Sequence, residues 1–409
     1  MSRLTAPRGT FDILPEQARI RAEVERTARE LLEAAGYGRI ETPTFEATEL
    51  FARGVGEATD IVQKEMYSFD DGGGRSLTLR PEGTAPVCRA YVEHGMHKLP
   101  QPVRLYYLSS FFRAERPQAG RYRQFWQLGI EALGSVDPAV DAETIALLAT
   151  ILARLGVSDV RLRLSSLGSP ATRAAYREDL GAYLRAHVDA LAPAVRERIE
   201  LNPLRAFDSD DPGTREVMAG APRLLDRLDA DDAAHFAAVR ELLDRAGVAH
   251  EIDSTLVRGL DYYTRTLFEF TSDALGAQSG VAGGGRYDGL IEQLGGPPTP
   301  GIGWAAGIER ILMASPERPA APPALDLYVA FEHARADAFA TLTDARAAGL
   351  AAQMELAGRS LKGQLKQAER LGARFVAVVE GESVRLRDLR AGTEETMPRA
   401  ALVDRLVAA

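Results

Sequence analysis

Cysteine is the scarcest residue in this chain, with Cys88 the single example among 409 residues. One cysteine cannot form an internal disulfide, which excludes the disulfide-stapled scaffolds of secreted proteins and fits a reducing, cytoplasmic setting. Histidine is also sparse, and no group of histidine and cysteine residues has the spacing of a metal site. We therefore expect no metal ion held by protein side chains.

Long apolar runs are missing as well. The N-terminal segment MSRLTAPRGTFDILPEQ has no continuous apolar stretch, so the sequence predicts no signal peptide. The most apolar later stretch, TIALLATILARL, is short for a membrane span and includes Arg154. We predict that this stretch is a buried helix, and we expect no association with a membrane.

Lysine supplies only four of the 49 basic residues, and the formal net charge is −9. A global negative field argues against non-specific binding of nucleic acid, although it leaves room for a local basic patch. The length of 409 residues and the 45% hydrophobic content predict two or three domains with an ample core.

Arginine is concentrated in the segment Phe112–Gly134, where Arg113, Arg116, Arg121 and Arg123 fall close together. Apolar, β-prone residues flank them, so the pattern predicts a hairpin of two long strands joined by an arginine-bearing loop. Guanidinium groups bind phosphate oxygens through two parallel hydrogen bonds, which suits the loop to a nucleoside triphosphate or a nucleic-acid end. A solvated, charged hairpin tip is the alternative.

The returning strand of this hairpin carries an amide and an acid. Side chains alternate along a strand, so Gln127 and Glu131 share a face with Phe125 and Gly129, while Trp126 takes the opposite face. An amide and an acid beside arginines predict a pocket for a polar, amine-bearing ligand. The alternative is an edge strand whose polar face is exposed to solvent.

Two further segments place polar groups near predicted strand ends. Glu82 and Thr84 sit where a strand meets a helix, a place where free backbone N–H groups converge, and plain helix capping is the alternative. Arg258, Tyr262 and Tyr263 cluster around a turn that precedes an alternating strand, and the alternative for the tyrosines is core packing.

Two glycine-rich segments follow. The segment Val281–Gly296 has three successive glycines but neither a GxGxxG nor a GK[ST] pattern, so we expect the glycines to let a ligand or backbone come close. The segment Gly301–Met313 reads as a strand running into a helix, with Arg310 in the first turns of that helix.

The order of expected elements divides the chain at a proline- and alanine-rich linker, at about residues 314–324. Residues 1–324 form the larger domain, with a helical insertion at about 170–250, in which His235 and His250 are expected at the surface. Residues 325–409 alternate strands and helices, which predicts a small α/β domain with a mostly buried sheet.

A helix predicted over residues 355–372 in the smaller domain carries Arg359, Lys362 and Lys366. The two lysines lie four residues apart on one face, so they form a basic stripe on an acidic protein. From charge alone, a solvated helix face is the alternative.

Several of these segments resemble the three motifs of class II aminoacyl-tRNA synthetases, in the correct order. RIETPTFEATELF is similar to motif 1, RAERPQAGRYRQF to motif 2 and GIGWAAGIERILM to motif 3. LVRGLDYYTRTLFEF and VAGGGRYDGLIEQLGG resemble signatures specific to histidyl-tRNA synthetases, and GRSLKGQLKQAERLGA resembles their anticodon-binding domain. Trp126 departs from the family, where many relatives carry a smaller or more polar ring, and its position on the opposite face predicts a change in packing only.

The resemblance covers essentially the whole chain and implies an α+β fold. The expected fold has the antiparallel sheet of class II synthetases, flanked by helices. It also has a helical insertion and a C-terminal α/β anticodon-binding domain. Residues 1–324 would be the catalytic domain and residues 325–409 the anticodon-binding domain. The family also implies a cytoplasmic homodimer, with the proline-bearing strand of motif 1 at its interface.

The activity that the resemblance implies is a histidine–tRNA ligase. L-histidine and ATP, with Mg²⁺ on the triphosphate, give histidyl-adenylate and pyrophosphate, and histidine then passes to the 3′-terminal adenosine of histidine tRNA. By resemblance, the site residues are catalytic Arg258 and Arg113; histidine-binding Glu82, Thr84, Gln127, Glu131, Tyr262, Tyr263 and Tyr287; ATP-binding Arg113, Glu115, Arg121 and Arg310; and tRNA-binding Arg116, Gln118, Arg359, Lys362 and Lys366.

Two other functions remain open from the sequence. The first is the non-catalytic, synthetase-like regulatory subunit of histidine biosynthesis, a binding protein whose members tend to lose the Arg258 signature and the C-terminal domain. The second is a class II synthetase for another amino acid, which would lack the LVRGLDYY and AGGGRYDGL segments. All of these features are present in this chain.

Overall fold

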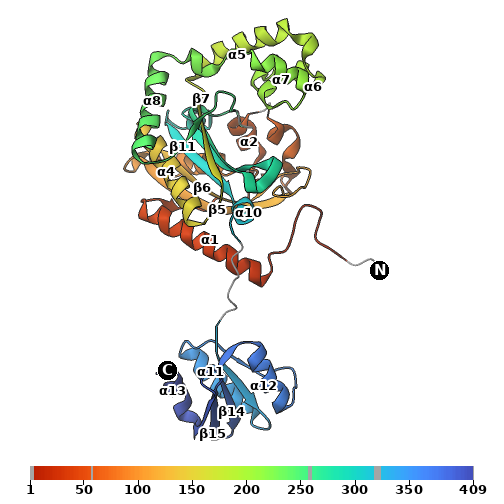
Figure 1. The fold of residues 1–409 in the computed structure, drawn as a ribbon, viewed down its shortest axis with the longest axis vertical. Coiled ribbons are helices and arrows are strands. Elements are labelled where there is room, and N and C mark those ends of the chain that lie inside the picture. The colour runs from red at the N-terminus through yellow and green to blue at the C-terminus, as the bar shows by residue number, and fades with distance from the viewer. Residues whose placement is uncertain (1–3, 57–58, 257–259, 317–323, 409) are drawn as a thin grey trace. The chain divides into compact units, whose positions relative to one another are not determined.

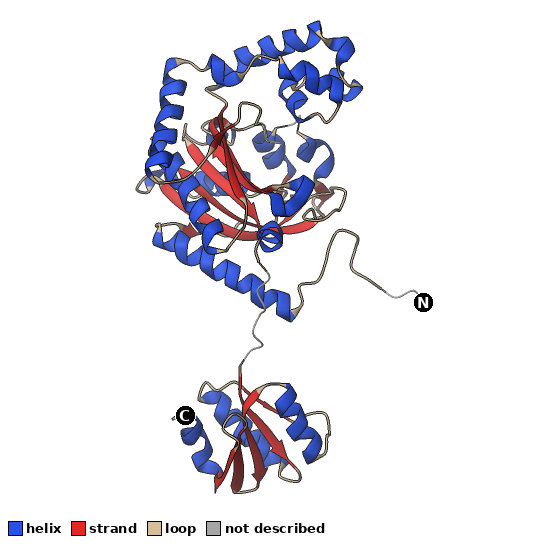
Figure 2. Ribbon diagram, in the orientation of Figure 1, coloured by secondary structure: helices blue, strands red, loops and turns tan. Residues whose placement is uncertain are grey.

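The computed structural model describes residues 4–56, 59–256, 260–316 and 324–408, and within these ranges an eight-stranded sheet forms the centre of the larger unit (Figures 1 and 2). Neighbouring strands are antiparallel except for the parallel pairs β1·β5 and β7·β8 at the two edges. The strands, in spatial order, are β1 (Gly38–Arg39), β5 (Val103–Phe112), β6 (Gln124–Leu133), β11 (Gly301–Gly307), β10 (Gly280–Arg286), β9 (Thr264–Ser272), β7 (Val160–Ser166) and β8 (Glu251–Ile252). A large, mainly antiparallel sheet flanked by helices confirms the predicted fold class.

The predicted arginine hairpin is formed by β5 and β6. Its register runs without a break from Val103 opposite Leu133 to Phe112 opposite Gln124. Both strands are rich in aromatic and branched residues, which suit a pleated surface that is covered on both sides. In the connecting loop, backbone hydrogen bonds between Gln118 and Arg121 close a tight turn.

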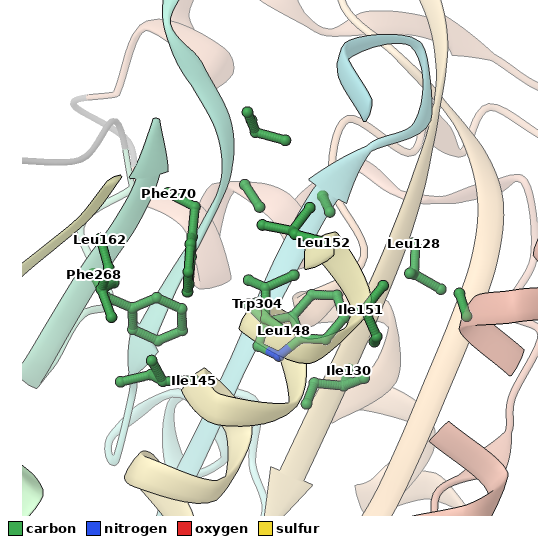
Figure 3. Packing of buried hydrophobic residues seen from close by; sticks show 14 of the residues in the cluster. Leu128, Ile130, Ile145, Leu148, Ile151, Leu152, Leu162, Phe268, Phe270 and Trp304 are labelled. Atoms are coloured by element: carbon green, nitrogen blue, oxygen red, sulfur yellow. The ribbon is translucent and has the colours of Figure 1, made fainter. Parts of the chain in front are cut away.

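One face of the sheet is covered by four helices, whose buried residues form one core cluster with Leu128 and Ile130 of β6 and Trp304 of β11. The indole N–H of Trp304 donates to the Thr144 carbonyl at 3.0 Å, and Leu148 of the same helix belongs with Trp304 to the packed cluster drawn in Figure 3. These helices are α1 (Pro15–Ala34), α4 (Pro138–Arg154), α8 (Ala230–Arg245) and α10 (Ile308–Ala314). The predicted buried helix is therefore confirmed as α4. No helix in the described ranges combines the length and apolar character that a bilayer crossing requires.

The opposite face carries the second core cluster, built on Tyr107, Phe111 and Leu133. The helices α3 (Thr84–Glu93) and α9 (Leu290–Gln293) cover this face, and α5 (Pro170–Ala186) of the insertion contributes to the same cluster. The alternation predicted for β6 is confirmed, because Trp126, Leu128 and Ile130 belong to the first cluster whereas Phe125 and Leu133 belong to the second.

A small three-stranded sheet precedes the hairpin in the chain. Its strands, in spatial order, are β2 (Phe45–Ala47), β4 (Ser76–Leu79) and β3 (Tyr67–Asp70). In the segment RIETPTFEATELF, which predicts a short strand broken at Pro43, the strand β2 ends at Ala47, because α2 (Thr48–Val55) begins there and buries Leu50 and Phe51. A π-helical turn, Ile61–Glu65, follows α2.

The insertion contains α5, α6 (Pro193–Arg196), α7 (Pro212–Ala219) and α8. Ser169, Asp211 and Asp229 precede three of these helices and accept hydrogen bonds from backbone amides of the first turns, which fixes where the helices begin. The short 3-10 turns of the larger unit are Met96–Lys98, Val188–Ala190, Pro203–Asp208, Leu224–Arg227 and Asp273–Gln278.

The expectation that His235 and His250 lie at the surface is wrong. His235 is buried between α8 and the sheet, with Nε2 at 3.6 Å from a carboxylate oxygen of Asp141. The His250 side chain is only 7% exposed. His235 is buried by packing between α8 and residues distant in sequence. The polar contacts of His250, in contrast, are with Val248 and Asp244, its near neighbours in the chain.

The chain divides into two compact units, Met1–Arg318 and Pro319–Ala409, and the expected linker lies largely outside the described residues. The second unit contains a five-stranded sheet. In spatial order, its first three strands are parallel to one another, and each of the last two is antiparallel to the strand before it. Its strands, in spatial order, are β13 (Ala352–Met354), β12 (Leu325–Phe331), β14 (Ala373–Glu380), β15 (Ser383–Asp388) and β16 (Thr393–Pro398). Its helices are α11 (Arg335–Ala347), α12 (Leu361–Arg370), α13 (Leu402–Val407) and the 3-10 turn Arg399–Ala401.

The helix expected over residues 355–372 is shorter than predicted, since α12 begins at Leu361. The buried carboxylate of Glu355 accepts hydrogen bonds from the backbone amides of Ala357 and Arg359, which holds the preceding segment in a loop. Arg359 therefore lies before the helix, whereas Lys362 and Lys366 are exposed on one face of it. Strands β13 and β16 were not predicted.

Candidate functional site

An open cavity of about 390 Å³ lies over the middle of the large sheet. Its wall includes five of the residues singled out in the sequence, namely Arg113, Glu115, Arg121, Gln127 and Arg310. The remaining lining residues come mostly from the arginine loop, β10 and β11; they are Gly120, Tyr122, Phe125, Glu269, Ser279, Gly280, Val281, Ala282, Gly283, Ala305, Gly307 and Glu309. Segments far apart in sequence thus meet at one cavity.

The arginines of this cavity are held by backbone carbonyls and by one shared acid. Arg113 donates from Nε to the Pro81 carbonyl at 2.9 Å, and its guanidinium lies 5.4 Å from the centre of the Phe125 ring. Glu115 lies between Arg113 and Arg121, with N···O distances of 3.8 and 3.4 Å. One carboxylate therefore lies between two guanidinium groups, and guanidinium groups suit the phosphate oxygens of a polyanion.

Arg310 closes the cavity from the α10 side. It donates to the carbonyl of Gly120 at 3.1 Å and to the carbonyl of Gly280. The neighbouring acid Glu309 is engaged elsewhere, because it pairs with Arg21 at 3.1 Å and accepts from the backbone amide of Trp126 at 3.1 Å. Arg310 thus ties the arginine loop to the strand that holds the glycine run.

The ring of Trp126, the residue that departs from the family pattern, lies on the face of the sheet opposite Gln127. The guanidinium of Arg21 lies 4.3 Å from the centre of its ring, and the ring belongs to the core on the α1 face. The predicted position on the opposite face is confirmed, and the expected change in packing stays a prediction.

Glu131 lies at the centre of a separate, buried cluster. Its side chain is fully buried, and its two carboxylate oxygens accept hydrogen bonds from Thr84 Oγ1, at 2.8 Å, and from the Tyr287 hydroxyl. Burial raises the pKa of Glu131 to about 8, although the hydrogen bonds from Tyr287 and Thr84 oppose that shift. A pKa of about 8 favours the protonated carboxyl at neutral pH.

Glu82 lies beside this cluster at the start of α3. Its carboxylate accepts from the backbone amides of Thr84 and Ala85, at 2.7 and 3.0 Å. Helix capping, the alternative for Glu82, is therefore confirmed. Burial raises the pKa of Glu82, and the hydrogen bonds from the two amides lower it. Each carboxylate oxygen still has a second lone pair for a ligand.

Three tyrosines line the same cluster. The rings of Tyr262 and Tyr263 lie 4.8 Å apart, those of Tyr262 and Tyr287 lie 5.7 Å apart, and all three are buried. The core-packing alternative for the tyrosine pair thus holds as well, since both rings belong to a hydrophobic cluster. The hydrogen bond from Tyr287 to Glu131 was not predicted from the sequence.

Sequence reasoning missed Tyr107 of β5. Its buried ring lies against Gly129, its partner across the hairpin, and against Gly83, where an added Cβ would come within 2.5 Å of ring atom Cζ. An added Cβ at Gly129 would overlap the same ring. The sequence could have indicated the contact with Gly129, because an aromatic residue opposite a glycine is a familiar cross-strand pair.

Glycines also make room for the acid and for tyrosine. An added Cβ at Gly303 would overlap Glu131 Oε2, and one at Gly301 would overlap the Tyr287 ring. In the run of three glycines, an added Cβ at Gly284 would overlap the carbonyl of Gly303. The predicted reason for the run, close approach of a backbone, is confirmed at Gly284.

The remaining predicted residues lie apart from the cavity or outside the described ranges. Arg116 and Gln118 are exposed on the arginine loop, and neither lines the cavity. Arg359, Lys362 and Lys366 are exposed on the second unit, and Arg258 lies outside the described residues. Among the residues that are described, no group of three or more His, Cys, Asp and Glu side chains is arranged to hold a metal ion.

Comparisons with known proteins agree with the sequence motifs. The family model for histidyl-tRNA synthetase matches residues 9–311. The histidine–tRNA ligase of Moorella thermoacetica is 50% identical over 409 residues, covering 97% of this chain and 96% of that protein. The histidine–tRNA ligase of Halorhodospira halophila is also 50% identical, covering 94% of this chain and 92% of its own length.

Solved structures give the same result. The apo histidyl-tRNA synthetase of S. aureus superposes with a TM-score of 0.81 at 37% identity, covering 99% of this chain and 100% of that one. A protein described as an ATP phosphoribosyltransferase regulatory subunit/histidyl-tRNA synthetase from Bacillus halodurans has a TM-score of 0.67 at 23% identity, with 93% and 99% covered, and shares the fold. This chain belongs to the histidyl-tRNA synthetase family.

Proposed function

We propose that the chain is a histidine–tRNA ligase that forms histidyl-adenylate from L-histidine and ATP and then transfers histidine to the 3′-terminal adenosine of histidine tRNA. The observation that carries this proposal is the pairing of two sites on one sheet. A buried acid with two hydroxyl partners suits an imidazole ring, and an open, arginine-walled cavity suits a triphosphate. The 50% identity to histidine–tRNA ligases over nearly the full length supports it.

Selection of histidine follows from the buried cluster. An imidazole ring has one donor and one acceptor nitrogen, and Glu131 can donate its proton to the acceptor because its pKa is about 8. We assign Gln127, Tyr262, Tyr263 and Tyr287 to the rest of the ring pocket, and Glu82 with Thr84 to the α-ammonium group. A side chain without ring nitrogens would leave the proton of the buried acid without an acceptor, which a polar pocket penalises strongly.

Adenylation joins two anions, because the histidine carboxylate attacks the α-phosphate of ATP while the bond to pyrophosphate breaks. Positive charge at the reacting phosphate is therefore the main requirement. We assign Arg113 to that charge and Arg121, Glu115 and Arg310 to the nucleotide. Arg258 is proposed for the same step on the sequence resemblance alone.

Mg²⁺ is proposed as part of the nucleotide substrate. The cavity offers Glu115 and Glu269 beside the arginines, and carboxylate oxygens are the donors that this ion prefers. An ion that enters on the triphosphate would neutralise the leaving pyrophosphate. The residues of the chain supply orientation and the remaining positive charge.

The tRNA contacts are proposed from exposure and charge. Arg116 and Gln118 at the tip of the arginine loop are free to meet the acceptor end, and exposed Arg359, Lys362 and Lys366 would bind the anticodon arm. The second unit is accordingly proposed as the anticodon-binding domain.

A homodimer is proposed on the motif 1 resemblance, and a cytoplasmic location on the single cysteine. Phe45 and Phe69 of the small sheet support an interface there, because these residues are 50% and 44% exposed and their ring centres lie 6.2 Å apart.

The test is exchange of labelled pyrophosphate into ATP, with histidine and, separately, with each other amino acid. Exchange that depends on histidine alone is the expected result. Exchange with a different amino acid would replace the proposal by another synthetase. Histidine binding without exchange would instead favour the non-catalytic regulatory paralogue.

A further inference from the structure

Arg173 of the insertion reaches the backbone that carries Tyr262 and Tyr263. It lies in the first turn of α5, and its Nη1 donates to the Asp261 carbonyl at 2.7 Å and to the Tyr263 carbonyl at 3.0 Å. Its Nη2 lies 3.5 Å from the Asp261 carboxylate. A single guanidinium therefore fixes both ends of the three-residue segment 261–263.

This arginine is not a solvated surface charge. Its side chain is 15% exposed, and burial lowers its pKa. A buried cation is stable only where its hydrogen bonds are made, so the two carbonyls and the carboxylate form a site built for this guanidinium. Without Arg173, the carbonyls of Asp261 and Tyr263 would lose a charged donor and the segment would lose a geometric restraint.

Asp261 is also held from two other sides. Its backbone amide donates to the Val55 carbonyl of α2 at 3.2 Å, and its carboxylate accepts from Asn202 Nδ2 of the insertion at 3.4 Å. Nearby, Asp60 pairs with Arg198 and Arg205, again from the insertion, at 3.3 and 2.7 Å. The insertion thus contacts the larger domain at the segment that precedes the tyrosines.

We propose that Arg173 is a positioning residue for the histidine pocket, and that it couples the placement of the insertion to the affinity for histidine. It acts through the backbone of residues 261–263, which places Tyr262 and Tyr263 against the buried cluster around Glu131. This inference rests on the proposed function, since the pocket must bind histidine for the coupling to matter.

Steady-state pyrophosphate exchange with Arg173→Met tests the proposal. This change keeps the length of the stem and removes all hydrogen-bond donors. The KM for histidine is expected to rise about 10- to 100-fold, the range associated with a displacement of about 1 Å, while the KM for ATP stays within about twofold. Arg173→Lys keeps the charge and one donor site, and it is expected to restore part of the loss.

Arg185→Met is the matched control. Arg185 lies three turns further along α5, is 53% exposed and pairs with Glu200 at 2.7 Å, so the variant removes the same charge from the same helix. The KM values of this variant should equal those of the unaltered protein. Thermal unfolding of all three variants shows whether a loss comes from unfolding, and Arg173→Lys carries the test if Arg173→Met does not fold.

The outcomes separate this inference from the proposed function. An unaltered protein that shows no histidine-dependent exchange overturns the proposed function itself. An active unaltered protein whose Arg173→Met and Arg173→Lys variants keep the KM for histidine overturns the positioning role. An equal loss for histidine and ATP, with no rescue by lysine, also overturns it, because that pattern indicates general structural damage.

Discussion

Glu131 and Arg121 both carry a group that the proposed reaction requires, yet the first is fully buried and the second has a side chain that is 43% exposed. The buried half of the site has its hydrogen bonds already made, by Thr84 and Tyr287. The open half has guanidinium groups anchored to carbonyls at one edge, with space beside them.

The difference in burial indicates how each half of the site can discriminate between ligands. In the buried half, a ligand that cannot accept the Glu131 proton leaves that proton with neither a partner nor water, which is costly. In the open half, water can replace a lost contact, so each arginine contributes mainly through charge aimed at the triphosphate. Removal of a side chain should therefore affect substrate affinity most in the buried half and the rate of adenylation most in the open half.

The largest effect is expected from Glu131→Ala. The KM for histidine should rise by about three orders of magnitude or more, because the partner of the imidazole ring is lost, and the KM for ATP should change by less than about threefold. Pyrophosphate exchange with each substrate varied in turn measures both constants. An equal loss for both substrates would contradict the assignment of Glu131 to histidine.

Arg113→Ala tests the open half. The kcat of adenylation should fall about 10²- to 10³-fold, as for the loss of one donor that stabilises charge in the transition state, while the KM for histidine stays nearly constant. Single-turnover formation of adenylate measures the step directly. Arg75→Ala, at an 80% exposed position on the β3–β4 turn, is the control and should leave the rate unchanged. A rise in the KM for histidine alone would contradict the assignment of Arg113 to the open half and would place it in the histidine pocket.

The two halves were not equally open to prediction from the sequence. The arginine hairpin was predictable because strand alternation and register are local, so the shared face of Gln127 and Glu131 followed from their spacing alone. The arginines of the connecting loop could be predicted for the same reason. Their backbone hydrogen-bond partners, such as the Pro81 carbonyl for Arg113, depend on tertiary contacts and could not be predicted from the sequence.

The buried half depended on packing that spacing does not encode. Tyr107 fits because Gly83, far away in the chain, leaves room for its ring. His235 is buried because α8 packs on the larger domain, although its neighbours in sequence are mixed in polarity. In the second unit, the Glu355 carboxylate competes for backbone amides and delays the start of α12, an effect that helix propensity cannot register.

Gly303→Ala and Gly307→Ala compare the two halves on a single strand. An added Cβ at Gly303 would overlap Glu131 Oε2 and the Ile130 carbonyl, whereas at Gly307 the nearest atom would be Arg310 Cδ at 3.5 Å. Overpacking should lower the free energy of unfolding by about 3 kcal/mol for Gly303→Ala, against less than about 1 kcal/mol for Gly307→Ala. Denaturant unfolding measures both, and equal losses would show that β11 is uniformly tight.

The smallest expected effect is on the pH dependence of the free energy of unfolding. The folded protein holds the Glu131 proton up to about pH 8, whereas an unfolded chain releases a glutamate proton near about pH 4.3. Between these values the folded state binds more protons, so this group makes the free energy of unfolding fall as pH rises, by at most about 1.4 kcal/mol per pH unit. Glu131→Gln keeps the shape and cannot titrate, so the difference between the unaltered protein and this variant, measured by denaturant unfolding from pH 5 to 8, isolates the contribution. A difference that does not change with pH would mean that Thr84 and Tyr287 already stabilise the ionised carboxylate, in which case the ligand-free pocket would present an acceptor, rather than a donor, to the imidazole ring.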